Sequence, residues 1–233
     1  MSVLLWDFDG TLARRPGMWR SCLIDVLDEQ VPGHAVTTEA LRPSLKDGFP
    51  WHRADTPHPE LCDPEAWWNH VEPLFASAYA SVGFAPVRSQ ELARHVRRHF
   101  TNADGWELFP DAIPALTALH QAGWNHIILS NHVPELEEIV HGLGLTPLIA
   151  AVLSSASSGH EKPHPQAFAI GRARAGNPDV VWMIGDSFTA DYRGAHDVGI
   201  PAILVRTQDE RARPCFDTLD KVVSFLSAAE PGA

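Results

Sequence analysis

Segments with the lengths and patterns of strands and helices alternate along the second half of the chain. Such alternation is typical of a parallel sheet with helices on both faces, because successive parallel strands are joined by crossovers that usually contain a helix. We therefore predict an α/β fold with a doubly wound, Rossmann-like parallel sheet. The expected strands are 124–129, 148–153, 180–184 and 202–205, and the expected helices are 111–122, 134–143, 165–175, 189–198 and 219–229.

A long stretch of helical sequence separates the first strand from the others. Residues 3–6 form a short apolar run that fits a buried strand, yet the next expected strand starts only at residue 124. A crossover between parallel strands needs only a dozen or so residues. We therefore predict a helical cap domain over 14–104, inserted over the carboxyl end of the first strand, and a core domain formed by 1–13 and 105–233. The helices expected in the cap are 18–30, 38–46 with an interruption at Pro43, a segment starting at Asp63-Pro64-Glu65, and 86–100.

Polar side chains lie at or just after the ends of the expected strands. Asp7 and Asp9 follow the first strand two positions apart, so their side chains point to the same side. Open α/β sheets bind ligands at the carboxyl ends of their strands, and two carboxylates held together there favour a cation or a shared proton. A single pair of this kind is as often a helix cap or a polar strand end. Further clusters in equivalent places favour a functional site: Ser130-Asn131, Lys162-Pro163, and Gly185-Asp186-Ser187 followed by Asp191.

These clusters resemble the motifs of the haloacid dehalogenase-like (HAD) hydrolase superfamily. The segments DFDGTL (7–12), LSN (129–131), EKPHPQAF (161–168) and GDSFTAD (185–191) stand in that family's order and spacing. The resemblance covers essentially the whole core, and the helical insert resembles the family's first type of cap. It implies the family's fold and a hydrolytic enzyme.

The resemblance also implies a role for each motif residue. Asp7 matches the nucleophile that forms an aspartyl-phosphate, Asp9 the general acid, and Lys162 the cation that offsets the charge of nucleophile and phosphoryl group. The implied cofactor is Mg²⁺, a hard cation that prefers oxygen ligands. The remaining implied residues are Thr11, Ser130 and Asn131 for substrate binding, Asp7, Asp186 and the backbone carbonyl of Asp9 for Mg²⁺, and Asp191 in support of Lys162 or the metal.

The second acid, Asp9, favours a phosphatase over a dehalogenase. An alcohol leaving group must be protonated, whereas a halide needs no proton, and the dehalogenating branch of the family has no acid there. We therefore expect hydrolysis of a small phosphate monoester. A phosphomutase with the same motifs is one alternative, and a 2-haloacid dehalogenase or phosphonate-cleaving enzyme is another, the last requiring a cap lysine, for which Lys46 is the candidate. We do not expect a purely binding role, because none of the family's catalytic acids is missing.

The composition limits the partners that this chain is expected to bind. Its formal net charge of −11 opposes a general affinity for nucleic acid or for an anionic membrane. Three scattered cysteines without CxxC spacing indicate neither a disulfide framework nor a zinc site. No apolar run reaches the length of a membrane span and no signal-peptide pattern is present. We expect a cytoplasmic protein whose partner is a small phosphorylated metabolite, with the ester and the oligomeric state left open.

Several side chains outside the motifs have more than one interpretation. Arg14 and Arg15 follow the first motif and would suit either the surface or a substrate anion. The loop 48–62 has no apolar period, and we hypothesise that it faces the site and selects the leaving group, the alternative being an exposed loop that packs on the cap helices. Its candidate contacts are Trp51, His52 and Arg53. His160 and His164 flank Lys162 and His132 follows the Ser-Asn pair, so these histidines could line the pocket, but we expect them at the surface or in support of the site.

Overall fold

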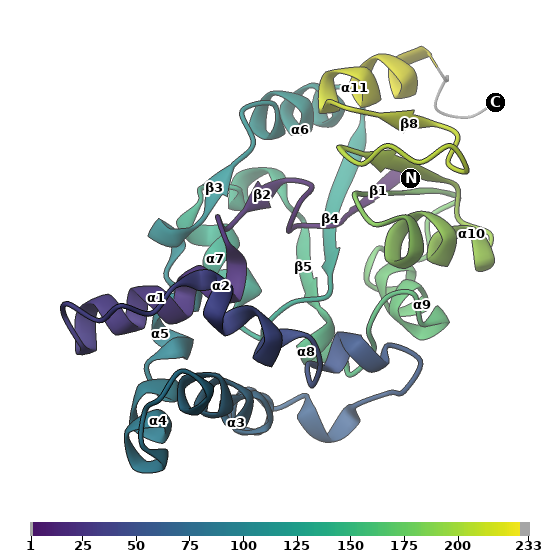
Figure 1. The fold of residues 1–233 in the computed structure, drawn as a ribbon. Coiled ribbons are helices and arrows are strands. Elements are labelled where there is room, and N and C mark those ends of the chain that lie inside the picture. The colour runs from purple at the N-terminus through teal and green to yellow at the C-terminus, as the bar shows by residue number, and fades with distance from the viewer. Residues whose placement is uncertain (1, 229–233) are drawn as a thin grey trace.

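The core is a parallel sheet whose central strand is the first one in the chain (Figure 1). The computed structural model describes residues 2–228. Its six-stranded sheet has the order β5-β4-β1-β6-β7-β8. All neighbouring strands are parallel, which confirms the predicted sheet. The strands are β1 (Ser2–Trp6), β4 (Trp124–Ser130), β5 (Ala151–Ser154), β6 (Val180–Gly185), β7 (Ala202–Val205) and β8 (Cys215–Phe216).

Both faces of the sheet are covered, because successive residues of β1 point in opposite directions. Val3 and Leu5 belong to the apolar cluster that contains α9 (Pro165–Arg174) and α10 (Gly194–Asp197). Leu4 and Trp6 belong to the cluster on the other face, with α6 (Ala112–Gln121) and α11 (Leu219–Ala228). Each of the four side chains is at most 1% exposed, and burying one contributes roughly 1.5–3 kcal/mol. This two-faced burial is why β1 reads as an uninterrupted apolar run.

Local departures from the sequence-based expectations have physical causes. The strand expected over 148–153 begins only at Ala151, because a 3₁₀ turn at Thr146–Leu148 with Pro147 inside it precedes the strand. The helix expected over 189–198 divides into a π-helical turn η6 (Phe188–Arg193) and α10. α7 covers Leu136–Gly142, shorter than expected, and the two-residue β8 is too short to show a period. The last residue of the expected helix 219–229 lies outside the described residues.

The predicted insert after β1 is present and is mainly helical. Its helices are α1 (Met18–Gln30), α2 (Thr38–Leu41), α3 (Pro64–Ser81), α4 (Pro86–Ala93) and α5 (Val96–Thr101). The expected start of α3 is confirmed, since the Asp63 carboxylate accepts the N–H of Ala66 at 3.0 Å. The helix expected over 86–100 is two helices. α2 ends at Leu41, and a 3₁₀ turn over Arg42–Leu45 contains Pro43.

Two short antiparallel strands join the insert to the core. Ala13–Arg14 (β2) pairs with Glu107–Leu108 (β3), so the two connections run side by side (Figure 1). The expectation that 14–104 is only helical is therefore wrong at its first residue, which belongs to a strand too short for periodicity to reveal. We propose that the domain boundaries at 13/14 and 104/105 lie at this ribbon.

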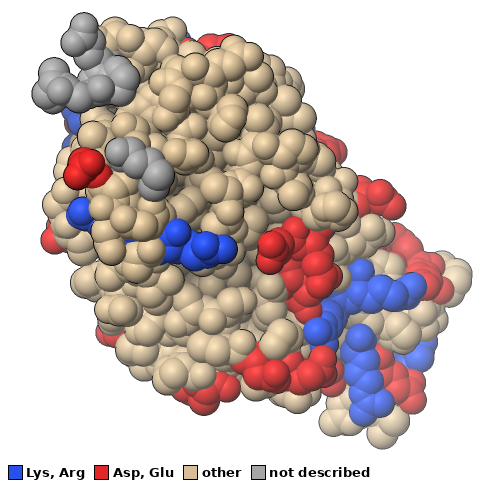
Figure 2. Space-filling model, turned by 180° about the vertical axis from the view of Figure 1, so that it is seen from behind, with Lys and Arg blue, Asp and Glu red and all other residues tan. Residues whose placement is uncertain are grey.

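Side chains of the insert also contact the core directly. The Glu135 carboxylate accepts the Trp68 indole N–H at 3.1 Å and the Arg97 Nε–H at 2.8 Å. The His58 N–H donates to the Gly159 carbonyl at 2.7 Å. Arginines of α4 and α5 pair with carboxylates, and Figure 2 shows basic and acidic side chains interleaved at the insert end of the molecule. Within residues 2–228, no helix combines the length and apolar character needed to cross a membrane.

Candidate active site

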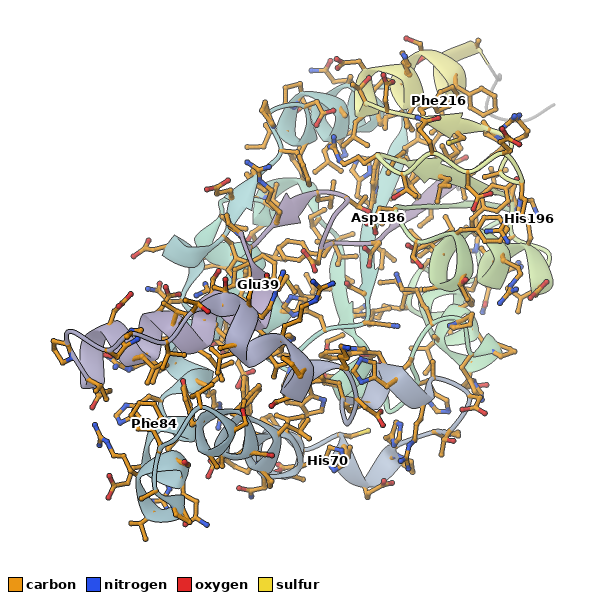
Figure 3. The ribbon with its side chains drawn as sticks, in the orientation of Figure 1. Glu39, His70, Phe84, Asp186, His196 and Phe216 are labelled. Carbon is orange, nitrogen blue, oxygen red and sulfur yellow. The ribbon has the colours of Figure 1, made fainter. Side chains whose placement is uncertain are left out.

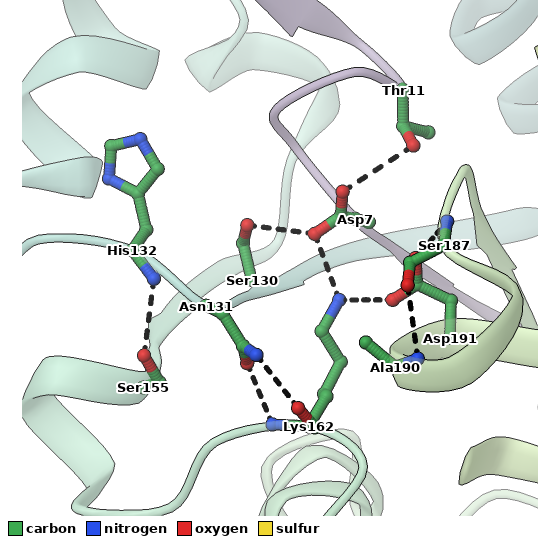
Figure 4. A network of polar contacts seen from close by, with 10 residues as sticks. All are labelled: Asp7, Thr11, Ser130, Asn131, His132, Ser155, Lys162, Ser187, Ala190 and Asp191. Atoms are coloured by element: carbon green, nitrogen blue, oxygen red, sulfur yellow. Dashed lines mark hydrogen bonds and ion pairs between the residues drawn. The ribbon is translucent and has the colours of Figure 1, made fainter. Parts of the chain in front are cut away.

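Asp7 stands at the carboxyl end of the central strand and is held by two donors on one oxygen. Its N–H continues the sheet by donating to the Ile184 carbonyl at 2.9 Å. Ser130 Oγ and Lys162 Nζ each donate to Asp7 Oδ1 at 2.8 Å (Figure 4). Thr11 Oγ1 lies 3.5 Å from the other oxygen, Oδ2. The parallel register of β1 with β4 explains the meeting with Ser130, because Asp7 directly follows β1 and Ser130 ends β4 at the same edge of the sheet.

Lys162 lies between two carboxylates and is almost inaccessible to solvent. Its Nζ is 2.8 Å from Asp7 Oδ1 and 2.5 Å from Asp191 Oδ1, and the residue is 2% exposed. Burial opposes its charge, but Asp191 and Asp7 outweigh burial and raise the pKa of Lys162 above its usual value. The Asn131 amide fixes its loop by donating to the Lys162 carbonyl at 2.8 Å and accepting the Lys162 N–H at 2.7 Å. Lys162 is thus a fixed cation beside Asp7.

Asp9 has an environment that favours a protonated carboxyl near neutral pH. Burial is the main cause and the negative charge of Asp7 the second, and together they raise the pKa of Asp9 to about 7 despite a hydrogen bond from the Gly10 backbone. The Gly10 N–H turns back to the Ala13 carbonyl at 2.8 Å with φ of 82°. A β-carbon at Gly10 would lie 2.4 Å from Asp186 Oδ2, so only glycine fits this approach of β1 and β6.

Asp186 belongs to an acidic cluster at the ends of β1 and β6. Carboxylate oxygens of Asp7, Asp186 and Asp191 lie within 4.8 Å of one another. Burial, followed by the charges of Asp7 and Asp191, raises the pKa of Asp186 to about 8. Figure 3 shows Asp186 in the core, whereas Glu39, His70 and Phe84 lie on the insert. Asp191 is committed on both oxygens, since Oδ1 pairs with Lys162 and Oδ2 accepts the Ser187 N–H at 3.0 Å. It is suited to hold Lys162 in place, as expected of a supporting residue.

A cavity of about 570 Å³ opens over this cluster between the core and the insert. Ligand pockets of small-molecule enzymes usually fall in this size range. Its core side includes Asp7, Asp9, Ser130, Asn131, Lys162 and Asp191, and its insert side includes Met18, Trp19, Trp51, His52, Ala54 and Phe100. Predicted motif residues therefore meet at one cavity, although Thr11 and Asp186 are not among its lining residues.

Comparison with known proteins assigns this arrangement to a family. Residues 1–199 match the model of the haloacid dehalogenase-like hydrolase family. The chain is 33% identical to the bovine (Bos taurus) haloacid dehalogenase-like hydrolase domain-containing protein 3, over 88% of this chain and 82% of that protein. The protein of that name from Danio rerio is 27% identical over 63% of this chain and 60% of its own length. A phosphoglycolate phosphatase from Rhodobacter capsulatus is 28% identical over 99% of this chain and 95% of its own. The chain belongs to the haloacid dehalogenase-like hydrolase family.

Solved structures confirm the HAD-like fold but do not separate the chemistries within it. A putative HAD hydrolase from Bacillus subtilis, in a structure bound to magnesium, superposes with a TM-score of 0.73 at 19% identity over 97% of this chain and 98% of that one. A 2-haloacid dehalogenase from Pseudomonas syringae superposes with a TM-score of 0.66 at 22% identity over 98% and 99%. Because both superpose over nearly the whole chain, the reaction must be argued from the side chains of the site.

The acidic cluster of this HAD-like hydrolase suits a divalent cation. Like charges within 4.8 Å repel one another, and no described residue donates a hydrogen bond to the Asp186 carboxylate. An oxygen-binding cation would remove both penalties. Asp7 and Asp186 are the ligands we favour, together with the Asp9 carbonyl implied by the family. Asp191 is the third carboxylate of the cluster, but both its oxygens are engaged by Lys162 and the Ser187 N–H.

Other predicted side chains fall partly inside and partly outside the cavity. Arg14 pairs with Glu107 at 2.9 Å, and Arg15 with Asp25 at 2.7 Å. Neither arginine lines the cavity, so their alternative interpretation as substrate contacts is not supported. In the loop 48–62, Trp51 and His52 line the cavity, as hypothesised, whereas Arg53 is exposed and does not.

His132 lines the cavity, which is the less favoured of the two positions that the sequence analysis left open for it. It is 3% exposed and stands beside Asn131. The sequence signal for this position was its place directly after the Ser-Asn pair at the end of β4. His160 and His164, by contrast, do not line the cavity.

Proposed function

We propose that this chain is a Mg²⁺-dependent phosphatase that hydrolyses a small phosphate monoester through a phosphorylated Asp7. The observation that carries the proposal is that a second acid, Asp9, lines the cavity beside Asp7. Burial and the charge of Asp7 raise the pKa of Asp9 to about 7. Such a carboxyl can give a proton near neutral pH and take it back. A second acid beside the nucleophile suits an alcohol leaving group and has no use in halide displacement. The Rhodobacter relative, named a phosphoglycolate phosphatase, supports the same class.

In the first step, Asp7 attacks phosphorus while Asp9 protonates the leaving oxygen. Asp7 Oδ1 accepts two hydrogen bonds and Oδ2 has only the 3.5 Å contact from Thr11, so Oδ2 is the oxygen we assign to the attack. The P–O bond to the alcohol breaks as the Asp7–phosphorus bond forms, and the alcohol leaves with the proton of Asp9. Lys162 and Ser130 stay beside Oδ1 and stabilise the charge that gathers on the phosphoryl group. Mg²⁺, when bound, supplies the charge neutralisation that lets a carboxylate approach a phosphate dianion.

In the second step, Asp9 is ionised and accepts a proton from water, which attacks the phosphorus of phospho-Asp7. This attack releases inorganic phosphate and restores both carboxyls to their starting states. The same residue therefore acts as acid and then as base, which requires a pKa near the working pH. A pKa of about 7 meets that requirement at neutral pH.

The alternatives within the family find less support among the side chains. A phosphonate-cleaving enzyme needs a lysine in the cap, but Lys46 is exposed and does not line the cavity. In a dehalogenase Asp9 would have no catalytic role, because a halide leaves without a proton. A phosphomutase uses the same four motifs, and its distinguishing property is transfer of the phosphoryl group to a second sugar hydroxyl instead of to water.

The test is phosphate release from a panel of esters with Mg²⁺, using the full chain and Asp7→Asn. The panel holds nitrophenyl phosphate, sugar phosphates, nucleotides and phosphoglycolate, and each reaction is also analysed for isomerised sugar phosphates. We expect Mg²⁺-dependent phosphate release by the wild type and none by Asp7→Asn. Chloride release from 2-chloropropionate without phosphate release from any ester would overturn the proposal in favour of a dehalogenase.

A further inference from the structure

The insert side of the cavity is built from aromatic rings that are already ordered by packing. Trp19 stacks on Phe100 with ring centroids 3.6 Å apart and planes 5° apart, and it also stacks on Trp51 at 6.4 Å. Met18 and His132 line the cavity with these rings. We call Met18, Trp19, Trp51, Phe100 and His132 the aromatic compartment. Trp19 is 8% and Phe100 1% exposed, so these two rings form the packed wall of the compartment, whereas Trp51 is only partly buried. Trp51, held by this packing, offers a flat apolar surface that loses little entropy when a ligand binds.

His132 brings an unpaired polar group into this compartment. Neither ring nitrogen has a hydrogen-bond partner among the described residues, although the side chain is fully buried between Phe8, Phe100 and Trp106. In Figure 4 the ring lies apart from the Asp7 network. The hydrogen bonds of His132 are made by its backbone: the N–H donates to Ser155 Oγ at 3.1 Å and the carbonyl accepts from Ser154 Oγ at 2.6 Å. Burial lowers the pKa of His132 to about 4, against the smaller effects of Asp7 and the Val133 backbone. The ring is therefore neutral at pH 7 and offers one donor and one acceptor.

The cavity lining offers no free lysine or arginine to a second anionic group. Lys162 is the only lysine or arginine among the lining residues, and it is engaged by Asp7 and Asp191. Three aspartates line the same cavity, so an additional carboxylate or phosphate on the substrate would meet their charge with no lysine or arginine to offset it. A neutral group on the substrate that hydrogen bonds to a ring nitrogen of His132 would instead be favoured, because that nitrogen has no other partner among the described residues.

We propose that the substrate's leaving group is uncharged, has a flat face that lies against Trp51 at the wall formed by Trp19 and Phe100, and hydrogen bonds to the His132 ring. His132 is then a specificity-determining residue for the hydrolysis proposed above, on which this inference rests. The substrate class is a phosphate monoester whose only anionic group is the phosphate that Asp7 attacks. Substrates with a second anion, phosphoglycolate included, fall outside this class.

The first experiment compares matched esters on the wild-type enzyme and needs no variant. Benzyl phosphate, the three pyridylmethyl phosphates and 4-carboxybenzyl phosphate share a one-carbon alcohol and a six-membered ring, and they differ in a polar atom or a charge. We expect kcat/KM of the best pyridylmethyl isomer to exceed that of benzyl phosphate about fivefold, the value of one neutral hydrogen bond. The carboxylate ester should be at least about tenfold poorer than benzyl phosphate.

The second experiment assigns the preference to individual residues. His132→Phe keeps the ring and removes both nitrogens, so the pyridylmethyl-to-benzyl ratio should fall to about one; a merely structural role would lower both rates and leave the ratio. Trp51→Ala should raise KM for benzyl phosphate about tenfold. The matched control is Arg53→Ala, two residues further on and outside the lining, which should change none of these values.

The outcomes separate this inference from the proposed function. If carboxybenzyl phosphate or phosphoglycolate is the best ester, or if His132→Phe keeps the wild-type ratio, the inference is wrong while Asp7-dependent hydrolysis of nitrophenyl phosphate leaves the phosphatase intact. If no ester is hydrolysed with Mg²⁺, the proposed function itself fails. Thermal melting checks that His132→Phe folds, and if it does not, the wild-type ester series decides.

Discussion

Replacing Glu161 by glutamine should stabilise the protein, and the gain should grow as pH rises. Glu161 is 2% exposed, and its Oε2 has no hydrogen-bond partner among the described residues. Burial raises its pKa from 4.5 to about 7, against the opposing effects of Ser155 and Lys162. An unpartnered buried carboxylate is costly when ionised. Glutamine has nearly the same shape and never ionises, so it removes that cost.

The sign and size follow from the difference in proton binding between the two states. Between pH 4.5 and 7 the folded state keeps the Glu161 proton that the unfolded chain has lost, so the stability of the wild type falls as pH rises through this window. Linkage gives a cost of about 1 kcal/mol at pH 5 and about 3 kcal/mol at pH 8 relative to a group that does not titrate. The advantage of Glu161→Gln should therefore grow by about 2–3 kcal/mol across this range. For a protein of this size, that is a gain of roughly 5–10 °C in melting temperature.

The assay is urea unfolding of wild type and Glu161→Gln at pH 5, 6, 7 and 8 with excess chelator. The other carboxyls titrate equally in both proteins, and any constant packing difference cancels when the curves are compared across pH. Glu137→Gln, which removes an exposed carboxylate of α7, is the control for loss of charge without burial. A stability difference that stays level from pH 5 to pH 8, or that shrinks, would refute the reasoning about burial at Glu161.

Other predictions test the site itself. Asp9→Asn should slow hydrolysis of alkyl phosphates by about 10²–10⁴-fold and that of nitrophenyl phosphate far less, because nitrophenolate leaves without a proton; equal losses on both would show that Asp9 is not the acid. Chelation should abolish turnover and Mg²⁺ should restore it, with Ca²⁺ a poor substitute because its coordination is larger and looser; full activity in excess chelator would contradict the metal site. Gly10→Ala should lower the free energy of unfolding by about 1–3 kcal/mol and reduce activity, because φ is 82° and the new methyl group would meet the Asp186 carboxylate; unchanged melting and turnover would show that the turn tolerates a side chain.

Elements with a strong local signal could be predicted from the sequence. The apolar run before Asp7 and the alternation after residue 111 predicted a parallel α/β sheet, and the start of α3 followed from a capping Asp63 before Pro64. The helical insert followed from the length between the first two core strands. These features depend on periodicity, capping and chain length, which operate over a few residues.

The meeting of the motif residues could be expected, but its geometry depends on the register of the sheet. Asp7 contacts Ser130 across 123 positions of sequence and Lys162 across 155. The sequence indicated that these residues stand at the same edge, because parallel strands end together. Which oxygen of Asp7 takes both donors, and the use of the Asn131 amide to hold Lys162, depend on side-chain packing at that edge.

The sequence by itself determined the fold class, the family and the residues at the chemical centre, because apolar patterning and the motifs are local in the chain. Only the tertiary structure decided which side chains surround the rest of the cavity. It buried His132 among rings from the insert and the core, paired Arg15 with Asp25, and left Arg53 outside the lining. Those outcomes depend on how the insert packs over the sheet. The contacts that determine this packing join residues far apart in the chain, and no periodicity or motif in the sequence marks these residues.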